Sequence, residues 1–427
     1  MKSIRPNHIN RYLWICSILL IMPFLNQCVR TKTDYDVIIV GGGVAGLSAA
    51  KNLNGLNTII LEKDSVLGGR VKTLNTNGHY IDLGADYVLH ESMINTLEVD
   101  ENIVTSDKPI AYLYNDRLYS GPTPYDCMKK VKAIDQALLD SLHEQLEFTA
   151  DKIDTLIYDF LNTNIKSVFP AALKDYNIKV SKFAWQRYNS SHFEKGNKVV
   201  VDYLMKGSSI NTSLNSSVFK VADKKKYVAV EFYDKMNHKN ILTAKKAIVT
   251  TPSMVALEII DQINSESKDF LENISYASFL VLSFVVNQPI TNNDFAYVLP
   301  VNSIFSNIVL HNTMEADEQI FQFYIAHEDL DKLALYDDIN SFAKQYLYNL
   351  WRIQKEDILF EHQYFWNNAG PVINDHFLKD WPIDIYQPST NVFLAGDYTW
   401  LDNYMPFGMI PAIFSGERAA QFCLEDF

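Results

Sequence analysis

The feature that most constrains the fold is a glycine-rich turn that follows an apolar run near the start of the chain. Residues 37–40 are apolar and β-branched, which is typical of a strand buried on both faces of a parallel sheet. Gly41, Gly43 and Gly46 then follow with the G-x-G-x-x-G spacing. These glycines permit a tight turn, close approach of the backbone to a pyrophosphate, and close packing of a helix on the strand. The pattern therefore predicts a dinucleotide-binding α/β fold.

The residues after the turn strengthen this prediction. Residues 45–53 read as a helix, whose first amides, including those of Val44 and Ala45, would point at a phosphate. A second apolar run, 58–61, ends in Glu62. An acid about twenty residues after the first glycine is placed to accept hydrogen bonds from an adenosine ribose. The fingerprint leaves open whether FAD or NAD is the ligand.

The segment from Lys63 onward favours FAD. The paired glycines that end at Gly69, followed by Arg70, resemble the N-terminal signature of the flavin-containing amine oxidase superfamily, which includes monoamine and polyamine oxidases, protoporphyrinogen oxidase and phytoene desaturase. The resemblance implies that the Glu62-Lys63 segment lies at the cofactor, that the glycines pass close to the flavin and that the arginine contacts FAD. It also implies that the turn containing Gly84 and Ala85 lies beside the isoalloxazine ring.

A second resemblance to the same family lies at the other end of the chain. It implies a buried strand that brings Gly396 and Asp397 to the cofactor, with the acid accepting from ribityl hydroxyls. A helix then begins at the flavin, so that Ile410, Pro411 and Ala412 are cofactor contacts. Pro411 stands where the family usually has glycine. The two stretches that resemble the family's second FAD signature are 391–399 and 412–420.

The resemblance implies an α/β protein with a Rossmann-type FAD-binding domain and an inserted α+β substrate lobe. In the middle of the chain, Val218 corresponds to a strand residue that meets the adenine through its backbone, and apolar segments at 199–204, 218–221, 227–232 and 247–251 read as the return of the FAD domain. The expected organisation is a leader at 1–27, an FAD-binding domain at 34–100, 193–273 and 389–427, and a substrate lobe at 101–192 and 274–388.

The substrate lobe departs from the amine oxidases at two positions. Many of them carry a lysine that holds a water near flavin N5 at the place of Val281, and monoamine oxidases carry an aromatic cage tyrosine at the place of Gly408. Reoxidation by oxygen with the help of a lysine is therefore not expected. The aromatic segment 364–371 contains no cysteine, so a thioether link to the flavin has no candidate there and the FAD is expected to be non-covalent.

No residue of the lobe shows the pattern of a catalytic acid and base. Tyr364, Trp366, Trp400 and Tyr404 are candidates for lining a substrate pocket, although aromatic side chains are more often plain core. The remaining lobe is expected to contain a strand at 319–325 and a helix near 338–351. Apolar residues at three- and four-residue intervals between 125 and 160 predict helices whose apolar stripe faces a core or, alternatively, a membrane.

The first residues have the outline of a secretory leader. Three basic residues precede an apolar stretch at 12–25, which is too short for a confident membrane span. Cys28 follows in a context that resembles a bacterial lipobox, although Gln27 replaces the usual small residue. Lipidation at Cys28, plain cleavage and an uncleaved anchor all stay open, and the chain is expected to be exported, either periplasmic or anchored to a membrane.

Composition excludes several functional classes. The net charge of −13 becomes −16 without residues 1–27, which argues against a nucleic-acid partner. The ten histidines lack metal-ligand spacing, so no metal site is expected. Beyond the leader only Cys127 and Cys423 remain; they could pair but form no disulfide framework. About 400 residues outside the leader suffice for two cores.

Three functions are consistent with these patterns. The first is an FAD-dependent amine oxidase that transfers a hydride from a C–N or C–H bond of a small organic substrate to flavin N5, with oxygen or a quinone as electron acceptor. The second is a dehydrogenase of a bulky apolar substrate, resembling protoporphyrinogen oxidase or a carotenoid desaturase. The third is a non-catalytic flavin-binding or partner-binding protein.

Overall fold

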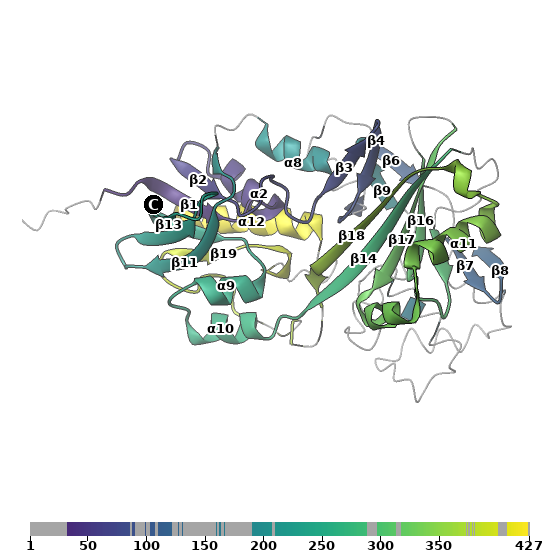
Figure 1. The fold of residues 1–427 in the computed structure, drawn as a ribbon. Coiled ribbons are helices and arrows are strands. Elements are labelled where there is room, and N and C mark those ends of the chain that lie inside the picture. Colours follow the sequence, from purple (N-terminus) through teal and green to yellow (C-terminus); the bar gives the residue numbers. More distant parts are fainter. Residues whose placement is uncertain are drawn as a thin grey trace, which may run out of the picture.

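The computed structural model describes residues 32–85, 88–89, 99, 103–106, 110–121, 127, 130, 159, 162–163, 166, 190–206, 210–287, 297–312, 317–372, 374, 376–377, 379, 381–399 and 408–425. These residues form two lobes, each built around a seven-stranded sheet, which lie side by side in Figure 1. The leader at 1–27 and Cys28 lie outside the described residues.

The first sheet contains the strand that precedes the glycine-rich turn. Its order is β10–β2–β1–β13–β12–β11, and β19 pairs with β13. Strands β10, β2, β1, β13 and β19 are parallel, whereas β12 is antiparallel to both of its neighbours. The strands are β1 (Tyr35–Val40), β2 (Thr58–Leu61), β10 (Asn211–Ser213), β11 (Ser217–Asp223), β12 (Val228–Tyr233), β13 (Lys239–Val249) and β19 (Val392–Leu394).

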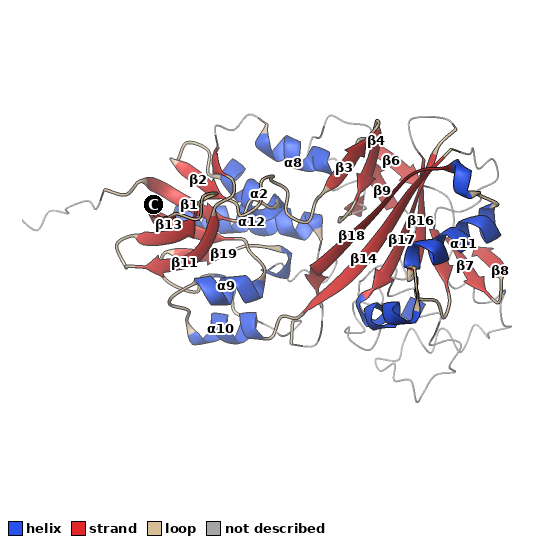
Figure 2. Ribbon diagram, in the orientation of Figure 1, coloured by secondary structure: helices blue, strands red, loops and turns tan. Residues whose placement is uncertain are grey.

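Strand β1 is buried on both faces, as its composition predicts. Ile38 and Val40 belong to one apolar core with residues of α9 and α10, and Val37 and Ile39 belong to another with residues of α2, α8 and α12. Figure 2 shows these helices around the first sheet. The predicted helix at 45–53 is therefore confirmed within one residue. The helices are α2 (Val44–Asn52), α8 (Lys198–Met205), α9 (Ser253–Ile259), α10 (Ser265–Glu272) and α12 (Met409–Glu425).

The second sheet has the order β18–β14–β17–β16–β15–β7–β8. One of its faces packs Leu282, Phe284 and Phe323 against α11 (Ile339–Trp351). The predicted strand at 319–325 and helix near 338–351 are confirmed as β17 and α11. The strands are β7 (Ile110–Tyr114), β8 (Arg117–Gly121), β14 (Tyr276–Val286), β15 (Tyr297–Pro300), β16 (Asn307–Asn312), β17 (Gln319–Ala326) and β18 (Ile358–Pro371).

The opposite face of the second sheet packs against the hairpin of β3 (Thr73–Thr76) and β4 (His79–Asp82), which follows the glycine-rich region in the chain. Ile81 and Leu83, in and just after this hairpin, form a small apolar core with Val285 of β14 and Ile320 of β17. The hairpin therefore connects the glycine-rich region to the second sheet. The remaining elements are β3 (Thr73–Thr76), β4 (His79–Asp82), β5 (Val88–Leu89), β6 (Ile103–Ser106), β9 (Ser190–Phe193) and the 3-10 helices η2 (His327–Leu335), η3 (Lys355–Asp357), η4 (Ile383–Tyr386) and η5 (Asp397–Thr399).

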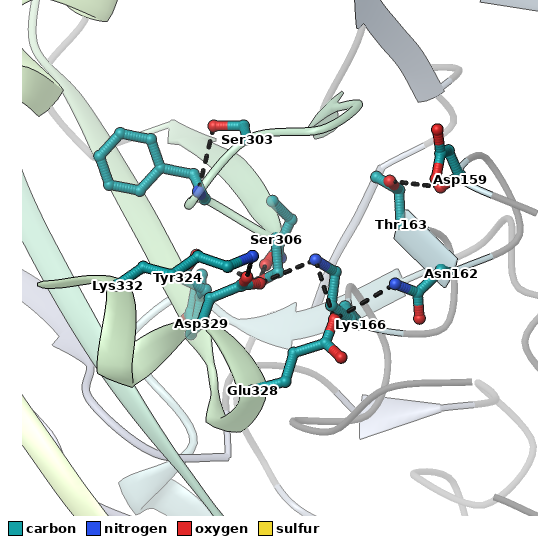
Figure 3. A network of polar contacts seen from close by, with 12 residues as sticks. Asp159, Asn162, Thr163, Lys166, Ser303, Ser306, Tyr324, Glu328, Asp329 and Lys332 are labelled. Carbon is teal, nitrogen blue, oxygen red and sulfur yellow. Dashed lines mark hydrogen bonds and ion pairs between the residues drawn. The ribbon is translucent and has the colours of Figure 1, made fainter. Parts of the chain in front are cut away.

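A polar network ties Lys166 to η2 (Figure 3). Lys166 Nζ lies 2.8 Å from Asp329 Oδ2 and 3.2 Å from Glu328 Oε1. The Asp329 side chain is fully buried, and Lys332 pairs with its other oxygen. The hydrogen bond from Lys332 to Asp329 is also the largest cause of the raised pKa of this lysine. Most of the predicted helical region at 125–160 lies outside the described residues.

Two further findings concern the apolar segment at 199–204 and the question of a membrane span. Residues 199–204 form part of the helix α8, which packs in the same core as α2. In the part of the chain that the structure describes, no helix combines the length and apolarity needed to cross a membrane.

Candidate functional site

The glycine-rich turn is held tightly between β1, β2 and α2. The Gly41 N–H donates to Leu61 O at 2.9 Å, and a Cβ on Gly46 would lie only 2.1 Å from Gly41 O. Only glycine therefore fits at position 46. Gly43 precedes α2, and among the described residues no side chain caps this helix end. The first amides of α2, those of Val44 and Ala45 included, are thus arranged to bind an anion such as a pyrophosphate.

Thr250 supports this turn, although the sequence patterns did not single it out. It directly follows β13, and its hydroxyl lies 3.0 Å from both Val40 O and Gly41 O. A Cβ on Gly41 would approach the same hydroxyl to 2.6 Å. Because β13 is parallel to β1, the two strands end at the same edge of the sheet, and this places Thr250 beside the glycine-rich turn.

Glu62 is buried and its carboxylate has a fixed orientation. Oε2 accepts from Gly42 N at 2.6 Å and Oε1 accepts from Asp64 N at 2.8 Å. Each carboxylate oxygen has a second lone pair, so the group can still accept from a ribose hydroxyl. The Ser216 N–H donates to Glu62 O at 2.7 Å, which places the start of β11, and with it Val218, near this acid. Lys63 is exposed.

The second glycine pair lies directly against the first turn. The Gly68 N–H donates to Gly42 O at 2.9 Å. Gly69 approaches Gly43 so closely that a Cβ on Gly69 would lie 3.2 Å from Gly43 Cα. The two glycine segments therefore form one continuous backbone surface with little side-chain bulk, where a ligand can approach the main chain.

Arg70 links this surface to the C-terminal segment. Its guanidinium donates to both oxygens of Asp397, at 2.8 and 2.7 Å, and to Ala369 O at 3.1 Å. Burial alone would lower the pKa of Arg70, but the charge and hydrogen bonds of Asp397 outweigh it, so the net pKa is raised. Both oxygens of the Asp397 carboxylate therefore already accept hydrogen bonds from an arginine, and a ligand would share this carboxylate with Arg70.

Two tyrosines border this ion pair. The Tyr276 hydroxyl accepts from Ser253 N at 3.1 Å, and Tyr398 directly follows Asp397 in the chain. Burial and the nearby Asp397 carboxylate raise the pKa of Tyr276 well above its ordinary value. Burial and the neighbouring Tyr276 do the same for the pKa of Tyr398. Both are neutral phenols at physiological pH.

The helix α12 begins near this pair and crosses α2 closely. The Gly396 N–H donates to Ser415 Oγ at 2.9 Å, which ties the end of β19 to the helix. Ile410, Pro411 and Ala412 are buried in the first turn of α12, where the missing N–H of a proline breaks no helical hydrogen bond. Pro411 in place of glycine is therefore compatible with the helix.

The turn at Gly84 and Ala85 packs on Arg70 and on the second sheet. The Ala85 N–H donates to Arg70 O at 3.1 Å. Trp366 Nε1 donates to Leu83 O at 2.6 Å, so the indole lies on the turn. Tyr364 packs beside Trp366 with ring centroids 4.9 Å apart.

Val281 lies on the same face of the sheet, fully buried, paired with Tyr324 on one side and Tyr364 on the other. The Tyr364 hydroxyl accepts from Lys72 Nζ at 3.0 Å. This face is therefore aromatic with one adjacent cation. The other two pocket candidates, Trp400 and Tyr404, lie outside the described residues.

Cysteines and metal ligands are not assembled into a site within the described ranges. Cys127 and Cys423 are both buried and lie in different apolar cores, so the two do not form a disulfide with each other. No group of three or more potential metal-ligating side chains occurs in the parts of the chain that the structure covers.

Comparison with known proteins agrees with this geometry. A family model described as an NAD(P)-binding Rossmann-like domain matches residues 39–97. Over 104 residues, 22% of this chain and 21% of the relative, the chain is 32% identical to pseudooxynicotine dehydrogenase of a Pseudomonas species. Over 56 residues, 12% of this chain and 11% of the relative, it is 54% identical to flavin-containing amine oxidase B of Cavia porcellus. The matches thus span about a fifth of these curated relatives or less.

Solved structures extend the likeness to the whole fold. Cyclohexylamine oxidase from Brevibacterium oxydans IH-35A has a TM-score of 0.72 at 14% identity, and the match covers 92% of this chain and 99% of that one. Putrescine oxidase with putrescine bound has a TM-score of 0.71 at 15% identity and the same coverage. At such identities the likeness shows the fold. The dinucleotide-binding segment is thus similar in sequence to that of flavin-containing amine oxidases, and the chain shares the fold of the solved amine oxidases.

Proposed function

We propose that this chain is an FAD-dependent oxidoreductase that oxidises the C–N bond of a small amine, with an alternative C–H donor tested below. The observation that carries the proposal is the meeting of three distant segments in one cradle. The uncapped start of α2, the glycine pair before Arg70, and Asp397 before α12 are joined by direct hydrogen bonds. The amine oxidases named above share this fold over nearly their whole length.

The residues present fit FAD. The first amides of α2 and the open backbone at Gly43 would hold the pyrophosphate, because a Cβ on Gly43 would have nothing but Gly69 Cα, at 4.0 Å, within reach. Glu62 would accept from the adenosine ribose. Both described cysteines are buried in the apolar cores, which supports non-covalent FAD.

When bound, FAD would supply a hydride acceptor at its N5 atom. The side chains and backbone would supply orientation and electrostatics. Arg70, held by Asp397, would keep a positive charge beside the cofactor, and the first amides of α12, including that of Ile410, would stabilise negative charge on the reduced form. Trp366 and Tyr364 would orient the substrate on the sheet face and exclude water.

Oxygen or a quinone would accept the electrons. Val281 is apolar and fully buried, so reoxidation through a lysine-held water has no support at this position. Stopped-flow reoxidation of the reduced protein by oxygen and by a soluble quinone would separate the two acceptors. A much faster quinone reaction would assign the chain to the dehydrogenases.

The first experiment is anaerobic reduction. The chain from Cys28 onward is purified, its flavin spectrum is recorded, and candidate primary and secondary amines are added while absorbance at about 450 nm is followed. Bleaching by an amine supports the proposal. Bound yellow flavin that only a bulky apolar donor bleaches would favour a desaturase-like enzyme, and flavin that no donor reduces would favour a non-catalytic role. A colourless chain that cannot be reconstituted with FAD would refute the proposal.

We further infer that residues 1–27 direct export and that Cys28 is a candidate site for lipid attachment. The support is the basic start, the apolar stretch and the lipobox-like context in the sequence. Mass spectrometry of the full chain expressed in a bacterium tests this, since a diacylglyceryl Cys28, a cleaved unmodified end and an intact leader have different masses. An intact leader on a protein found only in the cytoplasm would contradict export.

A further inference from the structure

The turn from Asp82 to Ala85 is held by side chains from three separate elements. Gln322 Nε2 of β17 donates to Asp82 O at 2.8 Å. Trp366 Nε1 of β18 donates to Leu83 O at 2.6 Å. Asn197 Nδ2, directly before α8, donates to Ala85 O at 2.7 Å. Three of the four carbonyls of the turn are therefore engaged by side-chain donors.

These donors are themselves fixed. Gln322 is 1% exposed and Asn197 is fully buried. Gln322 also lies 3.2 Å from Ser283 Oγ on the neighbouring strand, and the Asn197 N–H contacts both carboxylate oxygens of Asp82 at 3.0 Å. A buried amide that loses its acceptor bears a desolvation cost, so each side chain resists rotation away from the turn.

Close contacts on both sides of Gly84 restrict the position of the turn. A Cβ on Gly84 would lie 2.0 Å from Arg70 O on one side and 3.0 Å from Trp366 Cζ2 on the other. The turn is thus enclosed between the arginine that pairs with Asp397 and an indole of the second sheet. Neither contact can relax without moving the Arg70 backbone or the Trp366 indole.

We propose that Gln322, Trp366 and Asn197 are positioning residues that set the reduction potential of the flavin by fixing the peptide dipoles of this turn. The inference rests on the proposed function, in which the turn lies beside the isoalloxazine ring. The side-chain N–H that donates to each carbonyl partly compensates the negative end of that dipole beside the ring. Removing a donor leaves this negative end uncompensated and should disfavour the electron-rich reduced form.

The test compares Trp366→Phe and Gln322→Leu with the unchanged chain. Gln322→Met adds a variant of similar length that has no hydrogen-bond donor. Trp351→Phe is the matched control, because Trp351 packs on Phe321 at the opposite face of the same sheet, with ring centroids 4.8 Å apart. Flavin potentials are measured by equilibration with reference dyes, and thermal stability is measured in parallel.

We expect each of the three turn variants to shift the equilibrium toward oxidised flavin by about tenfold, which is about 30 mV for two electrons. Trp351→Phe should lower thermal stability and leave the potential unchanged. Turn variants with the potential of the unchanged chain, or a control that shifts the potential equally, would overturn the inference.

A second readout separates this inference from the proposed function. Hydrogen exchange of the amides at 83–85 is measured in the flavin-free protein, where Trp366→Phe should accelerate exchange and Trp351→Phe should not. Unaltered exchange in Trp366→Phe would overturn the inference even if amines bleach the flavin. Failure of the unchanged chain to bind FAD would instead overturn the proposed function, and with it the effect on potential.

Discussion

Arg70 and Asp397 are separated by 327 positions in the sequence, yet they form a two-pronged ion pair with nitrogen-to-oxygen distances of 2.7 and 2.8 Å. Parallel hydrogen bonds of this kind require the planar guanidinium, because an ammonium group cannot match both carboxylate oxygens in one plane. The pair therefore fixes the position of the C-terminal strand relative to the second glycine pair.

Removing one member of this pair should lower the free energy of unfolding more than removing both members. Asp397→Asn leaves a guanidinium without its carboxylate, so we expect the free energy of unfolding to fall by about 1–3 kcal/mol. In Arg70→Met combined with Asp397→Asn, part of that loss should be recovered. Urea unfolding of the single and double variants measures the coupling. Strictly additive losses would show that the two side chains are independent.

Gly46 should tolerate no side chain. A Cβ there would lie 2.1 Å from Gly41 O, so Gly46→Ala must displace α2 from β1. We expect FAD binding to weaken at least about tenfold, because the first amides of the helix move with it. Equilibrium titration of the flavin-free protein with FAD measures this. Gly55→Ala is the control, since no atom lies within 4 Å of its added Cβ and only the strained backbone, about 1 kcal/mol, is affected.

Stability should fall at alkaline pH. In the folded state the pKa values of Tyr276 and Tyr398 are raised above the ordinary 10.0. At a pH between the ordinary pKa and the raised pKa, the unfolded chain therefore loses protons that the folded chain retains. The stabilisation is complete below about pH 10 and is lost as pH rises, by about 1.4 kcal/mol per pH unit for each tyrosine. Thermal melts between about pH 8 and 11 of the unchanged chain and Tyr398→Phe test this, and identical slopes would contradict it.

Val281→Lys should test the apolar residue that stands where the resembling amine oxidases carry a lysine. The new ammonium would lie between Tyr324 and Tyr364 in a fully buried position, so its pKa should fall and the protein should be destabilised. If lysine-held water assists oxygen, the reduced variant should reoxidise in air faster than the unchanged chain. Val281→Met, of similar length but uncharged, is the control. Equal rates for the two variants would show that a lysine alone is not sufficient here.

Lys166 should contribute more to stability than Lys332, although both contact Asp329. The Lys166 side chain is 9% exposed, whereas that of Lys332 is 57% exposed. Among the described ion pairs, Lys166→Met leaves the buried carboxylate with the exposed Lys332, so we expect a loss of about 2–4 kcal/mol, compared with less than about 1 kcal/mol for Lys332→Met. Denaturant midpoints of the two variants measure the difference, and equal midpoints would contradict it.

The strand, turn and helix around Gly41 could be predicted from the sequence because each follows from a local pattern. The β-branched residues 37–40 and the glycine spacing act within about fifteen positions of one another. Arg70 and Asp397 were each predicted as cofactor contacts, but their pairing was not, since no local pattern joins residues so far apart.

Thr250, Asn197 and Gln322 could not be found in this way. A single hydroxyl or amide has no periodicity or spacing, and its role depends on which backbone atoms the fold brings beside it. Their functional meaning comes from the parallel pairing of β13 with β1 and from the contact of the second sheet with the turn at 82–85. The roles of such side chains can be assigned only from the three-dimensional arrangement of the sheets.

The contact between α2 and α12 can form only late in the synthesis of the chain. Ser48 Oγ donates to Ile413 O, and the two residues are 365 positions apart. At about 5–20 residues per second, a ribosome needs roughly 20 to 70 seconds after Ser48 before Ile413 exists. During that interval the side of α2 that packs against α12 has no partner. The cradle that begins at α2 and closes at Asp397 is therefore complete only at the end of synthesis, when the final helix packs against the first.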